Sequence, residues 1–417
     1  MSFSKSVRLL YGVSSVGLGH VRRSLAIADE IRRLRPDSVS IEWVAAEPAL
    51  SFLKQSGESV LEISTKLASM SSIMESQAPQ GRVTDMSRVA RLSSRRAKEN
   101  YALLRPSLSD YDILVQDEFV ETLFSFMWEQ NPPIPQKRAV VTDYLRLETG
   151  SKNPIDRLIL YYANRMLKRA LLSSQVRIFA DEPDSLPSNG KLRRWAETNN
   201  FQILGPIIGE VPEESKEDLR RELLPQAMVD VMKSGLKNRV VLFTIGGSSI
   251  GNKLINLAVE NAEFLSEKLG AAIVVLTGPR VQVSEARINS RELSKRLVIV
   301  PFTTSSLRYF AMADCVITQA GASTLNEVAE IGIPCVAIPI ANHWEQQANA
   351  ERFARKRGFE ILQYADLSRE RLVGAILSAV SKGNAVKKLE RSDTKSPQKK
   401  AAELILTLIS YRETRLH

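Results

Sequence analysis

The chain has 417 residues and a formal net charge of +10, with 44% hydrophobic and 25% charged residues. This length predicts two or three domains, and the composition excludes disordered and fibrous classes. No uncharged apolar run approaches the roughly 20 residues of a membrane span. The early run VRLLYGV leads into glycines instead of a signal-peptide cleavage site, so we expect a cytoplasmic protein. The charge favours an anionic partner, although solubility or a basic proteome explains it equally well.

In the first half of the chain, short apolar runs alternate with amphipathic helical patterns. The runs that predict strands are SVRLLYGV (6–13), SIEWVAA (40–46), DILVQD (112–117), RAVVTDY (138–144) and VRIFAD (176–181). Several are apolar on both faces, which is typical of parallel strands covered by helices. Because residues 23–34 between two such runs have helical spacing, the pattern predicts βα units with right-handed crossovers.

The alternation restarts at Val240, after the polar stretch 210–223. Strands are predicted at RVVLFTIGG (239–247), AAIVVLTG (271–278), LVIVPF (297–302), DCVITQAG (314–321) and PCVAIPI (334–340). The restart predicts two doubly wound, Rossmann-like α/β domains with a cleft between them. We place their limits at 1–205 and 206–385, followed by a polar loop and a helix in 386–417. Cys315 and Cys335 have no metal-ligand spacing and are expected to be core residues in a reducing compartment.

Ligands of such sheets bind at the carboxyl ends of the strands, and the run at 314–321 ends in a glycine turn. Gly321 permits close approach of a ligand, and the helix expected to start at Ala322, Ser323 and Thr324 favours an anion there. Glu327, one turn later, could accept two ribose hydroxyls. Thr324 and Glu327 fit a capping box equally well.

Three further loops of the second half carry polar or glycine residues after a predicted strand. The segment after residues 334–340 carries side chains that suit sugar hydroxyls, namely His343, Glu345, Gln346, Gln347 and Asn349. A solvated loop has the same composition. Unhindered amides and two hydroxyls that suit a phosphate are at Gly246, Gly247, Ser248 and Ser249. Phe302 and Thr303 end another strand, where a flat base could stack. Together these loops predict a nucleoside-diphosphate-sugar site.

In the first half, the glycine loop Gly17 to Gly19 ends at His20, one of only three histidines. A neutral imidazole, with an ordinary pKa of about 6.5, could remove a proton from an acceptor hydroxyl. His20 could instead bind an acceptor phosphate or be an ordinary residue of the first helical turn. Gly17, Gly19 and Arg23 are predicted on the same, acceptor side.

The segments GGSS (246–249), ADCVITQAGASTLNEVAEIGIPCVAIPI (313–340) and HWEQQANA (343–350) resemble the nucleotide-sugar-binding domain of GT-B glycosyltransferases. The closest resemblance is to the lipid II-forming N-acetylglucosaminyltransferases, with a family 28-like C-terminal domain. The resemblance implies that Glu327 binds the ribose of a UDP-sugar and that Thr303 lies near uracil. It also implies that Ser248 and Ser249 lie near the pyrophosphate and that Gln346 and Gln347 contact the sugar. Gly205 and Pro206 resemble the family's hinge.

The segment GLGH (17–20) matches the end of the family's N-terminal glycine loop. The preceding GVSSVG (12–17) departs from the longer glycine run that is typical of the family, so the acceptor contacts of that run are not carried over. The form from Gly17 to Arg23 also resembles nucleotide-sugar hydrolases. We therefore predict an inverting transferase that uses a UDP-sugar, with N-acetylhexosamine as the expected sugar, and needs neither a metal nor a cofactor. A hydrolase is the alternative, an epimerase would need carboxylates for which Asp117 and Glu118 are weak candidates, and a non-catalytic basic binder ranks last. The acceptor is open among lipid- and glycan-linked molecules, and no nucleic-acid motif is present.

Two stretches combine apolar and basic residues at helical spacing. One holds Arg88, Arg91 and Arg95, and the other, residues 153–172, mixes leucines and tyrosines with four basic residues. Such surfaces could lie on the inner face of a cell membrane. Apolar stripes that face the core, with solvated charges opposite, explain both about as well, and we favour that interpretation.

Overall fold

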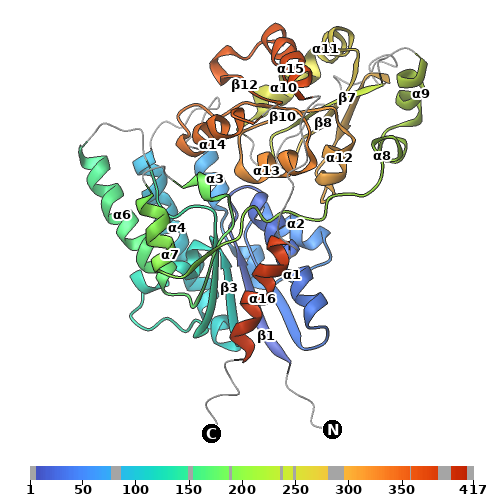
Figure 1. Ribbon diagram of the computed structural model, residues 1–417. Helices are drawn as coiled ribbons and strands as arrows, with labels where there is room; N and C mark the ends of the chain where they lie inside the picture. Colours follow the sequence, from blue (N-terminus) through green and yellow to red (C-terminus); the bar gives the residue numbers. More distant parts are fainter. Residues whose placement is uncertain are drawn as a thin grey trace. The chain divides into compact units, whose positions relative to one another are not determined.

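The computed structural model describes residues 6–76, 86–148, 154–186, 190–234, 238–247, 250–279, 295–356, 358–383 and 396–410. The chain forms two compact units (Figure 1). The first comprises Met1–Ile73, Asp85–Gly209 and Ser392–His417, and the second Met74–Thr84 and Glu210–Arg391. No helix of the described part is long and apolar enough to span a membrane.

The first unit is built on a parallel six-stranded sheet in the order β2-β1-β3-β4-β5-β6. Its strands are β1 (Val7–Val13), β2 (Val39–Val44), β3 (Ile113–Asp117), β4 (Lys137–Thr142), β5 (Val176–Phe179) and β6 (Phe201–Ile203). The central strands β1 and β3 are buried on both faces, as the apolar runs predict. Because the chain goes from β1 outward to β2 and then returns to β3, the direction of winding switches between β1 and β3.

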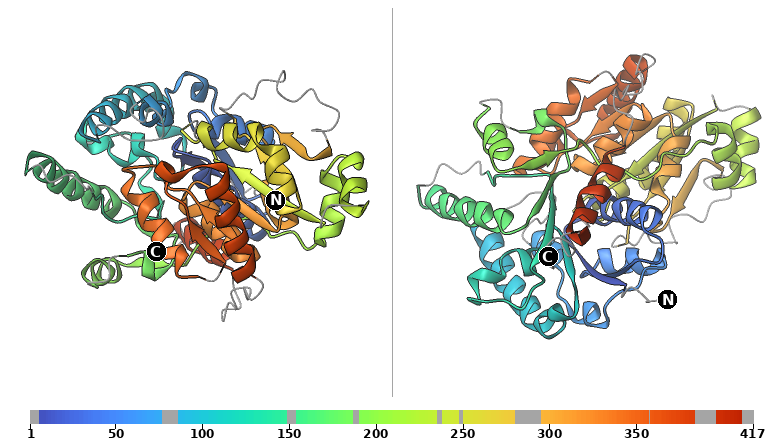
Figure 2. Two further views of the ribbon diagram at one scale, coloured as in Figure 1. Left: turned by 90° about the horizontal axis from the view of Figure 1, so that it is seen from above. Right: turned by 60° about the horizontal axis from the view of Figure 1, so that its bottom comes forward.

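Helices flank this sheet (Figures 1 and 2). They are α1 (Gly19–Leu34), α2 (Ala49–Gln55), α3 (Met70–Ser76, which begins in this unit), α4 (Met86–Leu104), α5 (Val120–Leu123), α6 (Pro154–Leu172), α7 (Lys191–Thr198) and α16 (Pro397–Ser410). Short 3-10 turns are η1 (Glu62–Lys66), η3 (Arg105–Asp110), η4 (Ser125–Met127) and η5 (Pro183–Ser185). The C-terminal helix α16 packs beside α1 and against β4 and β5, so the end of the chain completes the first unit.

The second unit has a parallel six-stranded sheet in the order β12-β11-β10-β7-β8-β9. Its strands are β7 (Arg239–Thr244), β8 (Ala271–Leu276), β9 (Leu297–Val300), β10 (Cys315–Thr318), β11 (Cys335–Ala337) and β12 (Phe359–Ile361). This order is that of the doubly wound dinucleotide-binding sheet, with the switch between β7 and β10. Cys315 and Cys335 are fully buried on neighbouring strands, which confirms them as core residues.

Helices cover this second sheet too, with one apolar cluster on each face. They are α8 (Lys216–Leu223), α9 (Gln226–Ser234), α10 (Asn252–Glu260), α11 (Ala262–Leu269), α12 (Ser306–Met312), α13 (Ala322–Ile331), α14 (Trp344–Ala354) and α15 (Arg369–Gly383), with a 3-10 turn η8 (Tyr364–Asp366).

The structure confirms all ten strands predicted from the apolar runs and adds two. The additions, β6 and β12, are three-residue edge strands, too short to produce a periodic pattern. The polar stretch 210–223 contains helix α8, whose N-cap Ser215 accepts a hydrogen bond from the backbone of Asp218.

Candidate functional site

Each unit places two loops at the switch point of its own sheet. In the first unit, the loop after β1 leads to His20, and β3 ends at Asp117, which is followed by Glu118. In the second, the loops after β7 and β10 contain Gly246 and Gly321. Because open α/β sheets bind ligands at this position, the topology favours both loop pairs as sites.

The loop between β1 and α1 is fixed by hydrogen bonds to its neighbours. Gly17 has a φ of +74°, which favours glycine, and its amide donates to Ser71 Oγ at 3.3 Å. Ser15 Oγ accepts from the backbone of Met70 at 3.0 Å. These contacts with the start of α3 set the direction in which α1 leaves the loop. His20 is therefore held at the first turn of α1.

The imidazole of His20 lies between two carboxylates. Its Nδ1 is 3.1 Å from Asp117 Oδ1, and its Nε2 is 3.6 Å from Glu118 Oε2. Arg23 Nη2 also lies 2.9 Å from Nδ1 of His20. The hydrogens of Nη2, however, have two carboxylate acceptors, Asp117 Oδ1 at 2.5 Å and Glu118 Oε1 at 3.3 Å. We therefore assign a proton to Nδ1, donated to Asp117, which leaves Nε2 as the atom available for acid–base chemistry.

The surrounding charges alter the pKa values of this cluster. Burial opposes protonation of His20, but the carboxylates of Glu118 and Asp117 outweigh it and raise the pKa of His20 to about 9. Burial would raise the pKa of Asp117, yet the Arg23 guanidinium lowers it to about 2. Burial and the charge of Asp143 raise the pKa of Glu118. Since the pKa values of both His20 and Glu118 are raised, the pair keeps its protons at neutral pH and releases them in the alkaline range.

Arg23 is the central cation of the cluster, with a side chain that is only 4% exposed. Its Nε donates to Asp117 Oδ2 at 2.7 Å, and its Nη1 donates to Asp143 Oδ2 at 2.7 Å. The neighbouring Ser24 also donates to Asp117. Since its three nitrogens all contact carboxylates, Arg23 holds the site in shape, and the predicted contact with an acceptor stays a prediction. The Asp143 partner was not predicted from the sequence.

Glu118 has an unusual backbone conformation. Its φ is +49°, a left-handed value that is uncommon for a residue other than glycine, and its Oε1 accepts from Thr142 Oγ1 and from the amide of Asp143. Such strain persists where surrounding contacts over-determine it, which is frequent at functional sites.

Three potential ligand atoms, one each from His20, Asp117 and Glu118, lie within 4.8 Å of one another. A divalent cation at this point would have to compete with the Arg23 guanidinium, which already neutralises Asp117. The donor set therefore fits an arginine-centred acid–base cluster better than a metal centre.

In the second unit, the loop after β7 is packed tightly against the end of β8. Gly246 has a φ of +67°, and a Cβ on Gly278 would lie 2.3 Å from the carbonyl oxygen of Gly246. A Cβ on Gly251, the N-cap of α10, would lie 2.4 Å from Cγ2 of Ile245 and 2.9 Å from the amide nitrogen of Gln319. The loops after β7, β8 and β10 thus form one packed group. Ser248 and Ser249 lie outside the described residues.

Helix α13 begins directly after Gly321, its N-cap, and no side chain caps it. Thr324 lies inside the first turn, so the capping-box interpretation of Thr324 and Glu327 is wrong. Ala322 and Ser323 are partly exposed at the helix start, where unpaired backbone amides favour an anion. Glu327 is 2% exposed, so a ribose could reach its carboxylate only after local rearrangement.

The polar loop after β11 leads into α14 and has defined contacts. His343 is the N-cap of α14, its Nδ1 accepting from the amide of Gln346, and burial lowers its pKa. Gln346 Oε1 accepts from the amide of Ile340 at 3.0 Å, and Gln347 donates to Glu351. His343, Gln346 and Gln347 therefore stabilise the loop and the start of α14, in addition to any contact that they make with a sugar.

The predicted donor residues do not all lie on neighbouring loops of the second unit. Asn349 of α14 donates to the carbonyl oxygen of Ala320 and so joins this segment to the loop after β10. Phe302 and Thr303 follow β9, an edge strand that β8 separates from β7, and Thr303 Oγ1 accepts from the amide of Ser305. This hydrogen bond of Thr303 lies within its own loop.

Comparison with known proteins shows what the second half of the chain is similar to. Residues 241–405 match the glycosyltransferase family 28 C-terminal domain. The chain is 30% identical over 179 residues to an uncharacterized glycosyltransferase of Methanopyrus kandleri, covering 42% of this chain and 46% of that protein. It is 30% identical over 164 residues to the UDP-N-acetylglucosamine–N-acetylmuramyl-(pentapeptide) pyrophosphoryl-undecaprenol N-acetylglucosamine transferase of Sinorhizobium fredii, covering 36% and 44%. The chain thus spans less than half the length of these two relatives.

Solved structures match over nearly the whole chain. The glycotransferase of kitacinnamycin superimposes with a TM-score of 0.62 at 17% identity, covering 97% of this chain and 100% of that one. At this identity the likeness concerns the fold, which agrees with two parallel six-stranded sheets. Residues 241–405 thus match the C-terminal domain of glycosyltransferase family 28, in a chain that has the GT-B fold.

Proposed function

We propose that the chain is a glycosyltransferase that moves a sugar, N-acetylhexosamine, from a UDP-sugar to an acceptor hydroxyl or phosphate. The observation that carries the proposal is the packed group of glycine loops at the β7–β10 switch point, inside the family 28 domain. Backbone amides at Gly246 and at the start of α13 would bind the diphosphate of the donor. The family resemblance of the sequence supports Glu327 as the ribose ligand.

The proposed reaction is an inverting displacement. An acceptor oxygen forms a bond to the anomeric carbon while the bond from that carbon to the diphosphate breaks, and its electron pair leaves with UDP. Nε2 of His20 accepts the acceptor's proton, and Asp117 stabilises the resulting imidazolium through Nδ1. Fixed amide donors aimed at the leaving diphosphate stabilise its developing charge, so no metal or further cofactor is invoked.

The acceptor is proposed to be lipid- or glycan-linked, with the protein lying peripherally on the inner face of the cell membrane. The relative from Sinorhizobium fredii acts, by its name, on a pyrophosphoryl-undecaprenol acceptor, which supports the lipid-linked class. The net charge of +10 supports an anionic surface over a neutral one.

A thermal-shift panel tests the donor. We expect UDP and UDP-N-acetylhexosamines to raise the melting temperature of the protein, and GDP and TDP to raise it less. The variant Glu327→Gln keeps the volume of this buried side chain but removes its charge, so the UDP response should fall while the folded protein persists. The matched control is Glu330→Gln, one turn later on the surface side of α13. An equal response to all nucleotides would defeat the choice of UDP.

The hydrolase alternative is tested in the same preparation. Free sugar released from UDP-N-acetylhexosamine at a rate independent of any added acceptor, and lost in His20→Ala, would assign water as the acceptor. Transfer that requires a polyprenyl-phosphate or glycan acceptor supports the transferase.

A further inference from the structure

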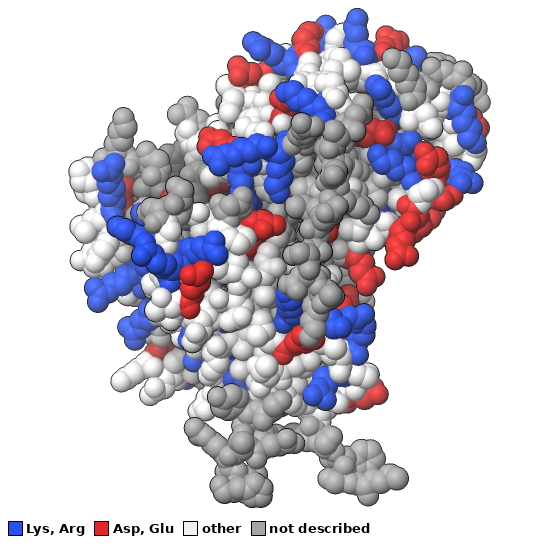
Figure 3. All heavy atoms as spheres, in the orientation of Figure 1, with Lys and Arg blue, Asp and Glu red and all other residues white. Residues whose placement is uncertain are grey.

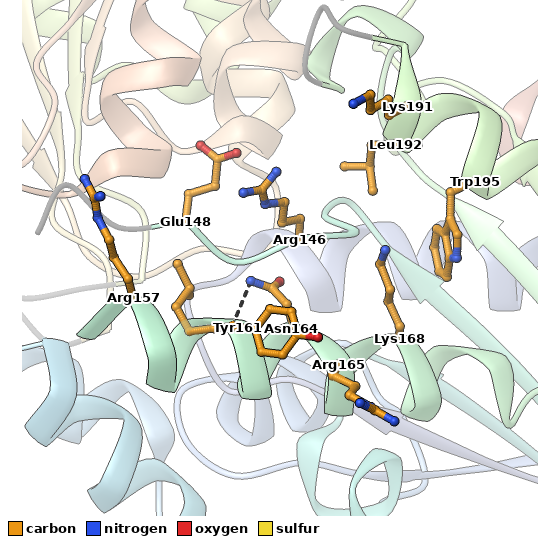
Figure 4. Close-up of a pocket in the computed structure, with 11 residues that line it drawn as sticks. Arg146, Glu148, Arg157, Tyr161, Asn164, Arg165, Lys168, Lys191, Leu192 and Trp195 are labelled. Atoms are coloured by element: carbon orange, nitrogen blue, oxygen red, sulfur yellow. Dashed lines mark hydrogen bonds between the residues drawn. The ribbon is translucent and has the colours of Figure 1, made fainter. Parts of the chain in front are cut away.

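A cavity lies in the first unit between helices α6 and α7, and its lining residues are not those of the cluster around His20. It has a volume of about 820 Å³ and is also lined by the segment after β4. Pockets that hold small organic ligands have volumes of roughly 300–1,000 Å³, so this one has room for a ligand of several rings. Figure 4 shows Arg146, Lys168 and Lys191 directed toward the hollow, with Trp195 at its side.

The cavity is strongly cationic. Of the described residues that line it, five are Lys or Arg and one, Glu148, is acidic. In the part of the chain that is described, Arg146, Arg157 and Arg165 make no ion pair. Figure 3 shows blue side chains gathered where Figure 1 draws α6 and α7. Cations without acidic partners around a hollow favour an anionic ligand, and guanidinium groups bind carboxylates and phosphates through paired hydrogen bonds.

The cations are spread along the cavity. Four residues that line it are three or four positions apart and so share one face of α6: Arg157, Tyr161, Asn164 and Lys168. At a rise of 1.5 Å per residue, Arg157 and Lys168 are about 16 Å apart along the helix axis. Figure 4 shows these two side chains at opposite sides of the hollow, without converging. A small anion would contact only one of them, so the spacing favours an extended ligand with several negative charges.

The walls of the cavity are fixed by contacts within the protein. Asn164 of α6 accepts from the amide of Leu147 at 2.7 Å and donates to its carbonyl oxygen at 2.9 Å, so the segment after β4 is tied to α6. Lys168 Nζ lies 4.7 Å from the centre of the Trp195 ring and so joins α6 to α7. The cavity is therefore formed before a ligand binds, which lowers the entropic cost of binding.

The segment after β4 connects this cavity with the cluster around His20. Asp143, which accepts from Arg23 at 2.7 Å, stands three residues before Arg146 of the cavity, so their Cα atoms are at most about 11 Å apart. Both residues follow β4 at the carboxyl end of the first sheet. A chain molecule with one hydroxyl at His20 can therefore extend into the cavity.

The exposed apolar stripe of α6 belongs to a different face of the helix. Ile155, Leu158, Ile159 and Tyr162 have exposed fractions of 65%, 57%, 46% and 56%, and none of these four lines the cavity. The buried residues of α6 lie in its last two turns. Our preference for a core-facing stripe in residues 153–172 is therefore wrong for the first half of α6.

We propose that the cavity is an acceptor subsite for an extended acidic glycan, one that carries a carboxylate or a phosphate on successive units. The cations along α6 bind the acidic groups, and the exposed ring of Tyr161 packs against the apolar face of a sugar ring. Nucleic acid is the other extended polyanion, but the cavity adjoins an acid–base cluster in a chain with a glycosyltransferase domain, which favours a glycan. The inference rests on the proposed function in one respect, since the glycan is taken to be the acceptor.

Titration calorimetry with galacturonic acid oligomers tests the subsite without donor or sugar transfer. Wild type should bind the hexamer more tightly than the monomer, because only the longer chain reaches both Arg157 and Lys168, and should not bind neutral maltohexaose. Arg146→Gln/Arg157→Gln removes two exposed cations and should bind the hexamer about five- to 25-fold more weakly, at up to about fivefold for each exposed ion pair lost. Phosphorylated maltohexaose is the second arm, and the tighter of the two acidic hexamers identifies the acidic group.

The matched control is Arg91→Gln/Lys98→Gln, which removes two exposed charges from α4 and should bind the hexamer as wild type does. An equal loss in this control, or unchanged binding by Arg146→Gln/Arg157→Gln, would overturn the proposal. Equal affinity for monomer and hexamer would mean a single-anion site and would overturn it too. An oligothymidylate that binds more tightly than either acidic hexamer, with the same loss in the cavity variant, would assign a nucleic acid instead.

The acceptor role has its own measurement. At saturating concentration the acidic hexamer should either receive the sugar or inhibit transfer to another acceptor, whereas transfer that is unchanged by the hexamer would overturn this role. All variants should keep the UDP thermal shift. Its absence in wild type would defeat the proposed donor while leaving the measured glycan binding in place, so the two failures are distinguishable.

Discussion

The role of His20 can be tested through the pH dependence of sugar transfer. If the neutral imidazole is the base, kcat/KM should rise with pH and level off near the pKa of His20, which is about 9. If His20 is instead a cation that binds an acceptor phosphate, kcat/KM should be constant at lower pH and fall above this pKa. The direction in which kcat/KM changes with pH, the limb of the pH profile, therefore separates the two roles.

Glu118→Gln moves this limb in a way that the structure predicts. Glu118 is the largest of the charges that raise the pKa of His20, and its Oε2 lies 3.6 Å from Nε2. Glutamine can still accept from Thr142 and from the amide of Asp143 through the same oxygen. The substitution thus removes the negative charge while retaining the local hydrogen bonds, and the pKa of His20 should fall toward its ordinary value of about 6.5.

The expected size follows from the fraction of neutral imidazole. At pH 8, a pKa of about 9 leaves roughly 9% of His20 neutral, and a fall of one to two units raises this to about 50–90%. Because the pKa of Glu118 is itself about 8, only about half of its charge is present at pH 8, and Glu118→Gln should transfer sugar severalfold faster than wild type at that pH and equally fast near pH 10. A gain of function from removing a buried acid is not expected for a residue that only supports the fold.

Initial rates at saturating UDP-sugar and low acceptor, measured from pH 6 to 10, give the comparison. The control is Glu121→Gln, another buried carboxyl near the end of the same strand that makes no described contact with His20. It should leave the limb in place. A limb that falls with pH in wild type, or one that stays near pH 9 in Glu118→Gln, would refute the assignment of His20 as the base.

Three further outcomes are expected. Burial raises the pKa of Glu121 to about 7, so the folded protein holds a proton that the unfolded chain releases near pH 4.5. The free energy of unfolding therefore falls as the pH rises between these two values. Glu121→Gln should raise the free energy of unfolding by about 3 kcal/mol at pH 8 but little at pH 5, as measured by urea unfolding. Asp117→Asn leaves Arg23 buried without its main partner and should lose about 3–5 kcal/mol at neutral pH, seen in the same unfolding assay. Gly278→Ala forces a Cβ against Gly246 and should lose more than about 1 kcal/mol together with much of the UDP thermal shift, whereas Gly374→Ala, with open space around it, should not.

The sequence predicts the sheets well because their strands are buried on both faces and read as continuous apolar runs. Of the cluster in the first unit, it predicts His20 and Arg23 as candidates. Arg23 and Ser24 lie three and four positions after His20, so the three residues share one face of α1, and Ser24 was not predicted. Their partner Asp117 is more than ninety residues away. Only the strand order, with β3 beside β1, brings Asp117 to that face, and local patterns do not contain strand order.

A signal for these acids was nevertheless present in the sequence. Asp117, Glu118 and Asp143 each follow an apolar run, at the carboxyl end of a predicted strand, where charged residues have no packing role. Glycine loops alone select neither Asp143 nor the two carboxylates named above as epimerase candidates, Asp117 and Glu118. The rule that ligands bind at this end of a parallel sheet, applied to every strand and not only to glycine loops, would have selected all three.

Helix α6 illustrates a limit of a different kind. A stripe of apolar residues at helical spacing predicts that one face avoids water, but the same stripe serves a core, a partner or a membrane. In α6 the core takes only the last two turns, and the first half keeps its stripe in solvent. Large exposed apolar patches on soluble domains usually mark interaction sites.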